Sequence, residues 1–299
     1  MIKYNNILIV GLGMMGSSLC KSIKNYKKKY RISKKITGFD SNQKSLDYAL
    51  KTKLIDTALS KLNDIEHPDL IVLCTPISTY TELISKLSKL VTKKSVLTDI
   101  GSSKGNLHNK IYKILNSTKI SYLSSHPMVG SEKSGVHNNQ SDMYKDKIIF
   151  LIDKSKCRHS DYVSLNSFWK SLGSHTHNIT KKKHDTLMSD TSHISHLMSY
   201  IFMQSLPQSI IDSNLSLLLG GGIKEHVRLS KSNPKMWTDI FINNKSNLNK
   251  SITRIEKNIS HLKNFYSNNN VENKIFSFDK NFSSIIHQTD LCITRAGAS

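Results

Sequence analysis

The stretch ILIVGLGMMGSS, residues 7–18, joins a continuous apolar run to a glycine-rich turn. The apolar residues 7–10 predict a strand that is buried on both faces, and the residues after the turn have helical character up to Lys24. Gly11, Gly13 and Gly16 have the spacing GxGxxG. In that motif the first glycine allows a tight turn, the second lets the backbone approach a pyrophosphate, and the third lets helix and strand pack closely. The stretch therefore predicts the first strand, turn and helix of a dinucleotide-binding α/β domain.

Strand-like and helix-like segments alternate along the chain up to about residue 178. We expect strands at 35–40, 69–74, 96–97, 120–123 and 147–152, and helices at 44–50, 79–90, 105–115 and 161–172. This alternation is typical of a doubly wound, Rossmann-like sheet with helices on both faces. Residues 1–178 are therefore expected to form a dinucleotide-binding domain.

The pattern changes in the second half of the chain. Between residues 181 and 264 we expect no strand, but helical periodicity covers 184–206 and 237–265, with breaks at 220–222 and at Pro234. Residues 179–266 are thus expected to form an all-helical domain, in which an exposed apolar face on the long helices would suit dimerisation. Residues 267–299 are expected to form an atypical C-terminal tail.

An acidic residue completes the expected cofactor site. Asp40 ends the second expected strand, 24 residues after Gly16, where a carboxylate can accept a hydrogen bond from the adenine ribose 2′-hydroxyl. Because the same carboxylate repels a 2′-phosphate, we expect NAD and not NADP. The Thr-Pro pair after the strand at 69–74 is expected to abut the cofactor. The residues expected to bind NAD are Gly11, Gly13, Met14, Met15, Gly16, Asp40, Thr75 and Pro76.

Composition narrows the classes of partner. The formal net charge is +21, from 43 Lys and Arg against 22 Asp and Glu. The lysines are scattered and little interleaved with aromatics, which favours solvated helix faces over a nucleic-acid site, although a basic surface helps attract a small anionic substrate. No apolar run approaches the ~20 residues that a membrane span needs. The chain begins with a strand-like segment, so we expect no signal peptide, and its four cysteines have no paired spacing, which indicates a reduced cytoplasmic protein without a metal site.

Polar segments follow two of the expected strands. The strand at 96–97 runs into the turn DIGSSK, residues 99–104, and the strand at 120–123 is expected to end in a polar loop, SSHP, residues 124–127. In an open parallel sheet, ligands bind outside such carboxyl ends. One segment offers a hydroxyl and the other the imidazole of His126, which precedes a proline that keeps its backbone extended. We therefore expect His126 to be a general base near neutral pH.

Several longer blocks carry a family resemblance. They are GLGMMGSS (11–18), Asp40, DIGSSKG (99–105), SHPMVGSEKSGV (125–136), SHISH (192–196), GGGIKEHVRLSKSNPKMW (220–237) and DIFINNK (239–245). On these blocks the sequence resembles the prephenate dehydrogenase family, including its cyclohexadienyl and arogenate dehydrogenase relatives, over roughly residues 5–266. The resemblance implies NAD-dependent oxidative decarboxylation of prephenate to 4-hydroxyphenylpyruvate in tyrosine biosynthesis, by a homodimer.

The resemblance also implies roles for single residues. His126 would take the proton of the substrate's ring 4-hydroxyl, and Ser102 would orient that imidazole near the nicotinamide. Activity should then fall as the pH drops through the pKa of the base, because only the neutral imidazole accepts a proton.

Four further positions match the substrate pocket of the family. Arg228 would bind a substrate carboxylate through its planar fork. His196 would lie near the side-chain end of the substrate, and Glu132 would be a pocket acid that gates or pairs with cationic groups. Lys224 matches a further pocket position.

Three other interpretations stay open on the sequence. An arogenate or dual-specificity cyclohexadienyl dehydrogenase has the same fold. A β-hydroxyacid dehydrogenase shares the architecture but uses a helical lysine in place of the histidine, and a basic nucleic-acid-binding protein is the non-enzymatic rival. Near the C-terminus, TDLCITRAGAS (289–299) resembles a short piece of the UDP-N-acetylglucosamine transferase of peptidoglycan synthesis. No activity is expected of this fragment, for which a fused or truncated reading frame is the expected origin.

Overall fold

The computed structural model describes residues 4–30, 32–130, 133–208 and 220–267. The chain divides into two compact units, of which the first comprises Met1–Met188 and Asn233–Lys245 and the second Ser189–Ser232 and Ser246–Ser299. Glu132 and all but the first residue of the expected tail, including its transferase-like fragment, lie outside the described residues. The expected domain boundaries at 178 and 266 stay predictions.

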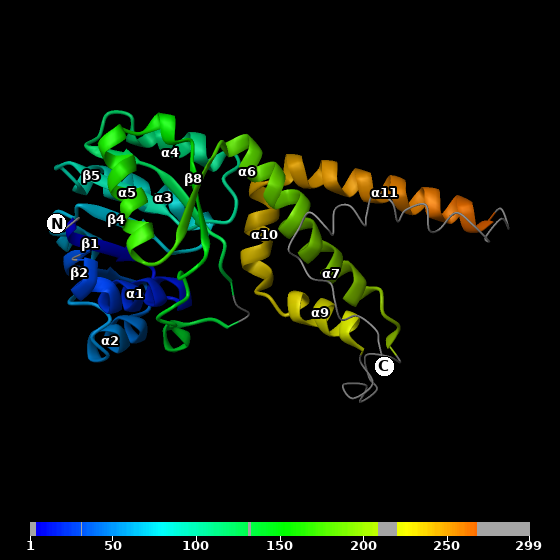
Figure 1. The fold of residues 1–299 in the computed structure, drawn as a ribbon, viewed down its shortest axis with the longest axis horizontal. Helices are drawn as coiled ribbons and strands as arrows, with labels where there is room; N and C mark the ends of the chain where they lie inside the picture. The colour runs from blue at the N-terminus through cyan, green and yellow to red at the C-terminus, as the bar shows by residue number, and fades with distance from the viewer. Residues whose placement is uncertain (1–3, 31, 131–132, 209–219, 268–299) are drawn as a thin grey trace. The chain divides into compact units, whose positions relative to one another are not determined.

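A six-stranded parallel sheet forms the frame of the first unit (Figure 1). Its strands are β1 (Tyr4–Val10), β2 (Ser33–Phe39), β3 (Thr57–Leu59), β4 (Leu70–Leu73), β5 (Ser95–Asp99) and β6 (Ile120–Tyr122). They lie in the order β3-β2-β1-β4-β5-β6, so the direction of strand addition reverses beside β1. This order confirms the doubly wound α/β fold, and β3 is an edge strand that the sequence did not predict.

Helices cover both faces of this sheet, and the alternation along β1 shows why. Ile7 and Ile9 lie in one buried cluster, while Leu8 and Val10 lie in the other. Successive side chains of a strand point to opposite faces, so a strand that is apolar at every position can stabilise two helical layers at once. The helices of this part of the chain are α1 (Met14–Tyr30), α2 (Gln43–Lys51), α3 (Tyr80–Leu90), α4 (Leu107–Leu115) and α5 (His159–Ser171).

A second, three-stranded sheet departs from the sequence-based expectation. It consists of β7 (Ser124–Pro127), β8 (Ile148–Ile152) and β9 (His175–Ile179), with β7 antiparallel and β9 parallel to β8. The expectation that residues 124–127 form a loop at the end of the first sheet is wrong. The Leu123 amide still donates to the Leu97 carbonyl of β5, but the chain then turns to pair with the apolar strand β8. The polar segment 124–127 thus forms a strand because it pairs with β8.

The other helices of the described chain follow strand β9 in the sequence. In the first unit these are α6 (Lys181–Met188) and α10 (Pro234–Asn243), and in the second α7 (Ile194–Gln204), α9 (Gly221–Ser230) and most of α11 (Lys245–Ser267). Short helical turns are η1 (Leu62–Asp64), η2 (Ile77–Thr79), η3 (Val136–Asn138), η4 (Lys154–Lys156) and the π-turn η5 (Ser189–His193). The expected helix at 237–265 is two helices, because Asn244 leaves the helical conformation at φ −111° and ψ 24°. No described helix combines the length and apolar character needed to span a membrane.

Candidate active site

The glycine turn between β1 and α1 has the steric features of a dinucleotide site. Gly11 has φ +96°, and a Cβ atom there would lie 2.8 Å from the Cys74 carbonyl carbon. A Cβ atom at Gly16 would lie 1.9 Å from the Gly11 oxygen, whereas one at Gly13 would meet no atom within 4 Å. Packing inside the fold therefore requires the first and third glycines. The second glycine faces open space, as the close approach of a pyrophosphate requires.

Asp40 lies beside this turn, as expected. Its Oδ2 accepts a hydrogen bond from the Leu12 amide at 2.6 Å, and its Oδ1 accepts one from the Asn42 amide at 2.8 Å. A carboxylate has further acceptor capacity beyond these two bonds, and it repels phosphate. The end of β2 thus provides a group that suits a ribose hydroxyl.

Thr75 completes this part of the site after β4. Its methyl carbon would lie 2.9 Å from a Cβ atom at Gly11, and its hydroxyl lies 2.8 Å from the hydroxyl of Thr79. Pro76 directly precedes the short helical turn η2. Met14 and Met15 begin α1, where the carbonyl of Met15 accepts a hydrogen bond from the Tyr144 hydroxyl at 2.8 Å. The carboxyl ends of β1, β2 and β4 therefore bring the expected NAD-binding residues together, and their donor set and open glycine fit that cofactor.

A buried ion pair lies at the carboxyl end of β5. The Lys104 ammonium lies 2.6 Å from Asp99 Oδ2, and both side chains are only 2% exposed. The other carboxylate oxygen of Asp99 accepts hydrogen bonds from the hydroxyls of Tyr122 at 2.8 Å and Ser124 at 2.6 Å. The same ammonium also donates to the Ser125 carbonyl at 2.9 Å, so Lys104 links the turn after β5 to strand β7.

The charges of this pair are coupled. Burial alone would raise the pKa of Asp99, but the Lys104 ammonium and the hydrogen bonds from Ser124 and Tyr122 outweigh it and hold that pKa below its ordinary value. Burial lowers the pKa of Lys104, and the Asp99 carboxylate opposes that change. Asp99 is therefore an ionised, acceptor-only group beneath the candidate site.

Strand β7 holds the candidate base in place. Ser125 precedes His126 in this strand. Its hydroxyl lies 2.7 Å from the Thr98 hydroxyl and accepts a hydrogen bond from the Trp169 indole at 3.1 Å. His126 itself pairs with Phe150 across the sheet, and its side chain is 7% exposed. The backbone that carries this imidazole is thus fixed on both sides.

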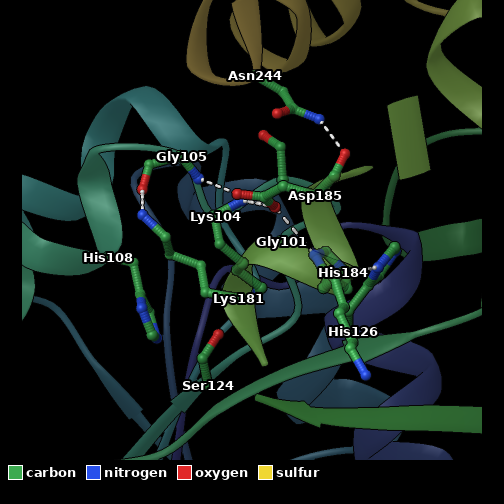
Figure 2. A network of polar contacts seen from close by, with 12 residues as sticks. Gly101, Lys104, Gly105, His108, Ser124, His126, Lys181, His184, Asp185 and Asn244 are labelled. Atoms are coloured by element: carbon green, nitrogen blue, oxygen red, sulfur yellow. Dashed lines mark hydrogen bonds and ion pairs between the residues drawn. The ribbon is translucent and has the colours of Figure 1, made fainter. Parts of the chain in front are cut away.

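Three side chains lie in series behind this imidazole (Figure 2). His126 Nδ1 lies 2.8 Å from His184 Nε2, and His184 Nδ1 lies 2.9 Å from Asp185 Oδ1. Both of the latter residues belong to α6. Burial lowers the pKa of His184, while its bond to Asp185 opposes that change. Burial would raise the pKa of Asp185, but the hydrogen bonds and charge around it keep it lowered.

Backbone amides of the turn after β5 anchor the far end of this series. Asp185 Oδ1 accepts from the Lys104 amide at 3.0 Å, and Asp185 Oδ2 accepts from the Gly105 amide at 2.8 Å. The Asn244 side-chain amide donates to the Asp185 carbonyl at 2.7 Å. The DIGSSKG turn is therefore connected to His126 by hydrogen bonds through Asp185 and His184 of α6.

The sequence did not single out His184 and Asp185. Their one signal is the adjacent acid and imidazole in KKKHDT, residues 181–186, and both side chains are buried in spite of their polarity. The expected orienting residue, Ser102, lies half-buried in the turn. Its hydroxyl makes no hydrogen bond to any residue that the structure describes, so its role stays a prediction. His184 lies beside Nδ1 of the imidazole that Ser102 was expected to orient.

The expected substrate-binding residues of the helical half lie in the second unit. Arg228 Nε donates to Glu225 Oε2 at 2.9 Å within α9, and about half of each side chain is exposed. His196 Nδ1 lies 3.0 Å from the Ser192 carbonyl, and burial lowers its pKa with a further contribution from the Arg228 charge. Lys224 is exposed on the same helix as Arg228. His196 and Arg228 are thus close enough to interact electrostatically.

Among the residues that the structure describes, no group of His, Cys, Asp or Glu side chains gathers closely enough to hold a metal ion.

Comparisons with known proteins identify similar sequences and structures. The prephenate dehydrogenase from A. aeolicus, solved with hydroxyphenyl propionate and NAD+, superposes with a TM-score of 0.83 at 29% identity, covering 95% of this chain and 98% of that one. The prephenate dehydrogenase of Lactococcus lactis is 28% identical over 258 residues, which are 86% of this chain and 69% of that protein. The cyclohexadienyl dehydrogenase of Zymomonas mobilis is 24% identical over 247 residues, or 82% of each chain.

Family models match both halves of the sequence. The model of the prephenate dehydrogenase dimerization domain matches residues 180–280. The model of the prephenate dehydrogenase nucleotide-binding domain matches residues 23–178, more than half of the chain. On this match, which includes the strand that carries His126, the chain belongs to the prephenate dehydrogenase family.

Proposed function

We propose that this chain is an NAD-dependent prephenate dehydrogenase that converts prephenate to 4-hydroxyphenylpyruvate and carbon dioxide. One observation carries the proposal: His126 is a buried imidazole, fixed by its strand and hydrogen-bonded to His184 through Nδ1, in the same unit as the glycine turn. NAD is the cofactor, supported by the nucleotide-binding family model and by the NAD+ in the A. aeolicus relative.

The bound NAD supplies the acceptor for the hydride that leaves ring carbon C4. His126 accepts the proton of the 4-hydroxyl as the carbonyl forms, so the C–H electron pair and the O–H proton leave in different directions. The ring carboxylate then leaves as carbon dioxide, and its bonding electrons make the ring aromatic. The phenolate so formed takes the proton back from the imidazolium of His126. The reaction therefore needs a base that holds one proton temporarily, and it releases no net proton.

Substrate binding is proposed for the second unit. Both carboxylates of prephenate are anionic, and the planar fork of Arg228 suits one of them. Because Glu225 occupies that guanidinium in the free protein, a substrate carboxylate would compete with it. The family resemblance supports three further residues in the substrate pocket: His196, Lys224 and Glu132. It also supports Ser102 as a residue that orients the imidazole of His126.

A homodimer is proposed from the dimerization-domain model that matches residues 180–280. The net charge of +21 suits an anionic substrate and cofactor, and we assign no nucleic-acid or membrane partner. The three described cysteines, Cys20, Cys74 and Cys157, are free thiols, as expected of the cytoplasmic location that we propose.

The assay that tests this function follows NADH absorbance with NAD and prephenate, and then with NAD and arogenate. We expect turnover with prephenate. Comparable kcat/KM values for both substrates would assign the dual specificity of the cyclohexadienyl enzymes, for which the Zymomonas relative is the supporting observation. Absence of NADH formation with both substrates, from protein whose folding is confirmed by circular dichroism, would reject the proposed activity.

A further inference from the structure

The hydrogen bonds behind His126 have a direction that can be derived from their far end. An ionised carboxylate can only accept hydrogen bonds. Asp185 already accepts from two backbone amides, those of Lys104 and Gly105, and its pKa is lowered, so it is ionised near neutral pH. The ring nitrogen that lies 2.9 Å from its Oδ1 must therefore be a donor, which puts a proton on His184 Nδ1.

The second link follows from the first. His184 is fully buried, and burial lowers its pKa, so the ring is neutral and has one proton only. With that proton on Nδ1, its Nε2 atom is an acceptor. The atom 2.8 Å away, His126 Nδ1, must then be the donor of the bond between the two rings.

We propose that His184 and Asp185 are positioning residues that hold His126 in the tautomer with its proton on Nδ1, which leaves the lone pair on Nε2 for the substrate's hydroxyl proton. This inference rests on the proposed function for its catalytic meaning, but the tautomer itself is a property of the free protein. Figure 2 shows the side chains of His126 and His184 next to each other.

The same arrangement serves the step after proton transfer. When Nε2 takes a proton, His126 Nδ1 keeps its hydrogen bond to His184, and His184 keeps its bond to Asp185. The positive charge is then partly compensated along a series of bonds that ends on a carboxylate, and no ring has to turn. Such prearranged acceptors stabilise a charge as it develops, without reorganisation.

The fold holds the series rigidly. The turn after β5 approaches α10 so closely that a Cβ atom at Gly105, where φ is +40°, would lie 1.9 Å from the Asn243 carbonyl oxygen. Asn243 also donates to the Ser103 hydroxyl at 3.0 Å, and Asn244 donates to the Asp185 carbonyl. Asp185 is thus fixed from the turn and from the end of α10, both in the first unit.

The direct test is ¹⁵N NMR of histidine-labelled protein without ligands, with the His126 signals assigned by their loss in His126→Asn. We expect the wild type to show a protonated Nδ1 and an unprotonated Nε2 on His126. In His184→Phe, which keeps an aromatic ring but removes both polar atoms, this preference should be lost. His175→Phe, at an exposed histidine of β9, is the matched control and should leave the His126 signals unchanged.

Kinetics provide the second readout. His184→Phe should lower kcat on the order of 10²–10⁴-fold, as expected when a base is held in the wrong tautomer, with KM values for prephenate and NAD changed less than about 3-fold. His184→Gln should recover much of the lost kcat, because its amide can accept from His126 and donate to Asp185.

A wild-type His126 with its proton on Nε2 would overturn the inference, and so would a His184→Phe variant with wild-type kcat. The NMR result stands even if the protein turns over neither prephenate nor arogenate. Failure of the proposed function and failure of the tautomer assignment are therefore separate outcomes.

Discussion

Replacing Lys104 by Met tests how the turn after β5 is held. The substitution removes one partner of a buried ion pair and leaves the Asp99 carboxylate with three neutral donors, the Gly101 amide and the Tyr122 and Ser124 hydroxyls. Breaking a buried pair in this way costs about 3–5 kcal/mol, because the remaining charge is uncompensated. For a folded unit of this size that corresponds to a decrease in melting temperature of roughly 6–20 °C.

The stability difference between the wild type and Lys104→Met should depend on pH in a defined direction. In the wild type the pKa of Asp99 is lowered on folding, so its stabilising effect is present above the unfolded pKa of about 3.9 and is lost as the pH falls through the folded pKa. Without Lys104, burial raises that pKa instead, and the charged carboxylate destabilises the fold at neutral pH. The difference in stability between wild type and Lys104→Met should therefore shrink as the pH falls towards 4 and Asp99 is protonated in the variant.

Urea unfolding followed by tryptophan fluorescence measures this difference, because both tryptophans, Trp169 and Trp237, belong to the first unit. Lys86→Met is the control, since its exposed pair with Glu82 should contribute less than about 1 kcal/mol. The double variant Asp99→Asn with Lys104→Met should recover part of the loss. A loss below about 1 kcal/mol at neutral pH, or a difference that grows on acidification, would refute the reasoning.

Four further substitutions test the two binding regions. Gly13→Ala should fold normally but weaken NAD binding by about 10-fold or more, because the new methyl group enters open space where a pyrophosphate approaches. Gly16→Ala should instead lower the melting temperature, because its methyl group meets the Gly11 oxygen. Asp40→Ala should raise the KM for NAD and narrow the preference over NADP, as comparative initial rates with both nucleotides would show. Arg228→Ala should raise the KM for prephenate with little change in kcat, and an unchanged KM would remove it from the substrate site.

Local sequence patterns were sufficient for five of the six strands of the first sheet, all except the edge strand β3. The apolar run 7–10, the glycine spacing and Asp40 each act within one strand–turn–helix unit, where the hydrophobic pattern and turn chemistry decide the structure. The family resemblance and the alternation of strands and helices extended this to the doubly wound order, which the structure confirms.

The second sheet and the orientation of His126 were not accessible in that way. Residues 124–127 have no strand-like apolar pattern, and they pair with β8 only because that apolar strand needs a partner. The contact between His126 and His184 spans 58 residues and joins a strand to a helix. Local periodicity does not predict such a contact, so the sequence indicated His126, the proposed base, but not its buried neighbours His184 and Asp185.

The measurement that tests the central claim most directly is the kcat of His126→Asn with prephenate, made together with its dissociation constant for NAD. If His126 accepts the hydroxyl proton, kcat should fall about 10²–10⁴-fold while the affinity for NAD stays within about 2-fold of the wild type. A folded His126→Asn variant that turns prephenate over at the wild-type rate would contradict the account.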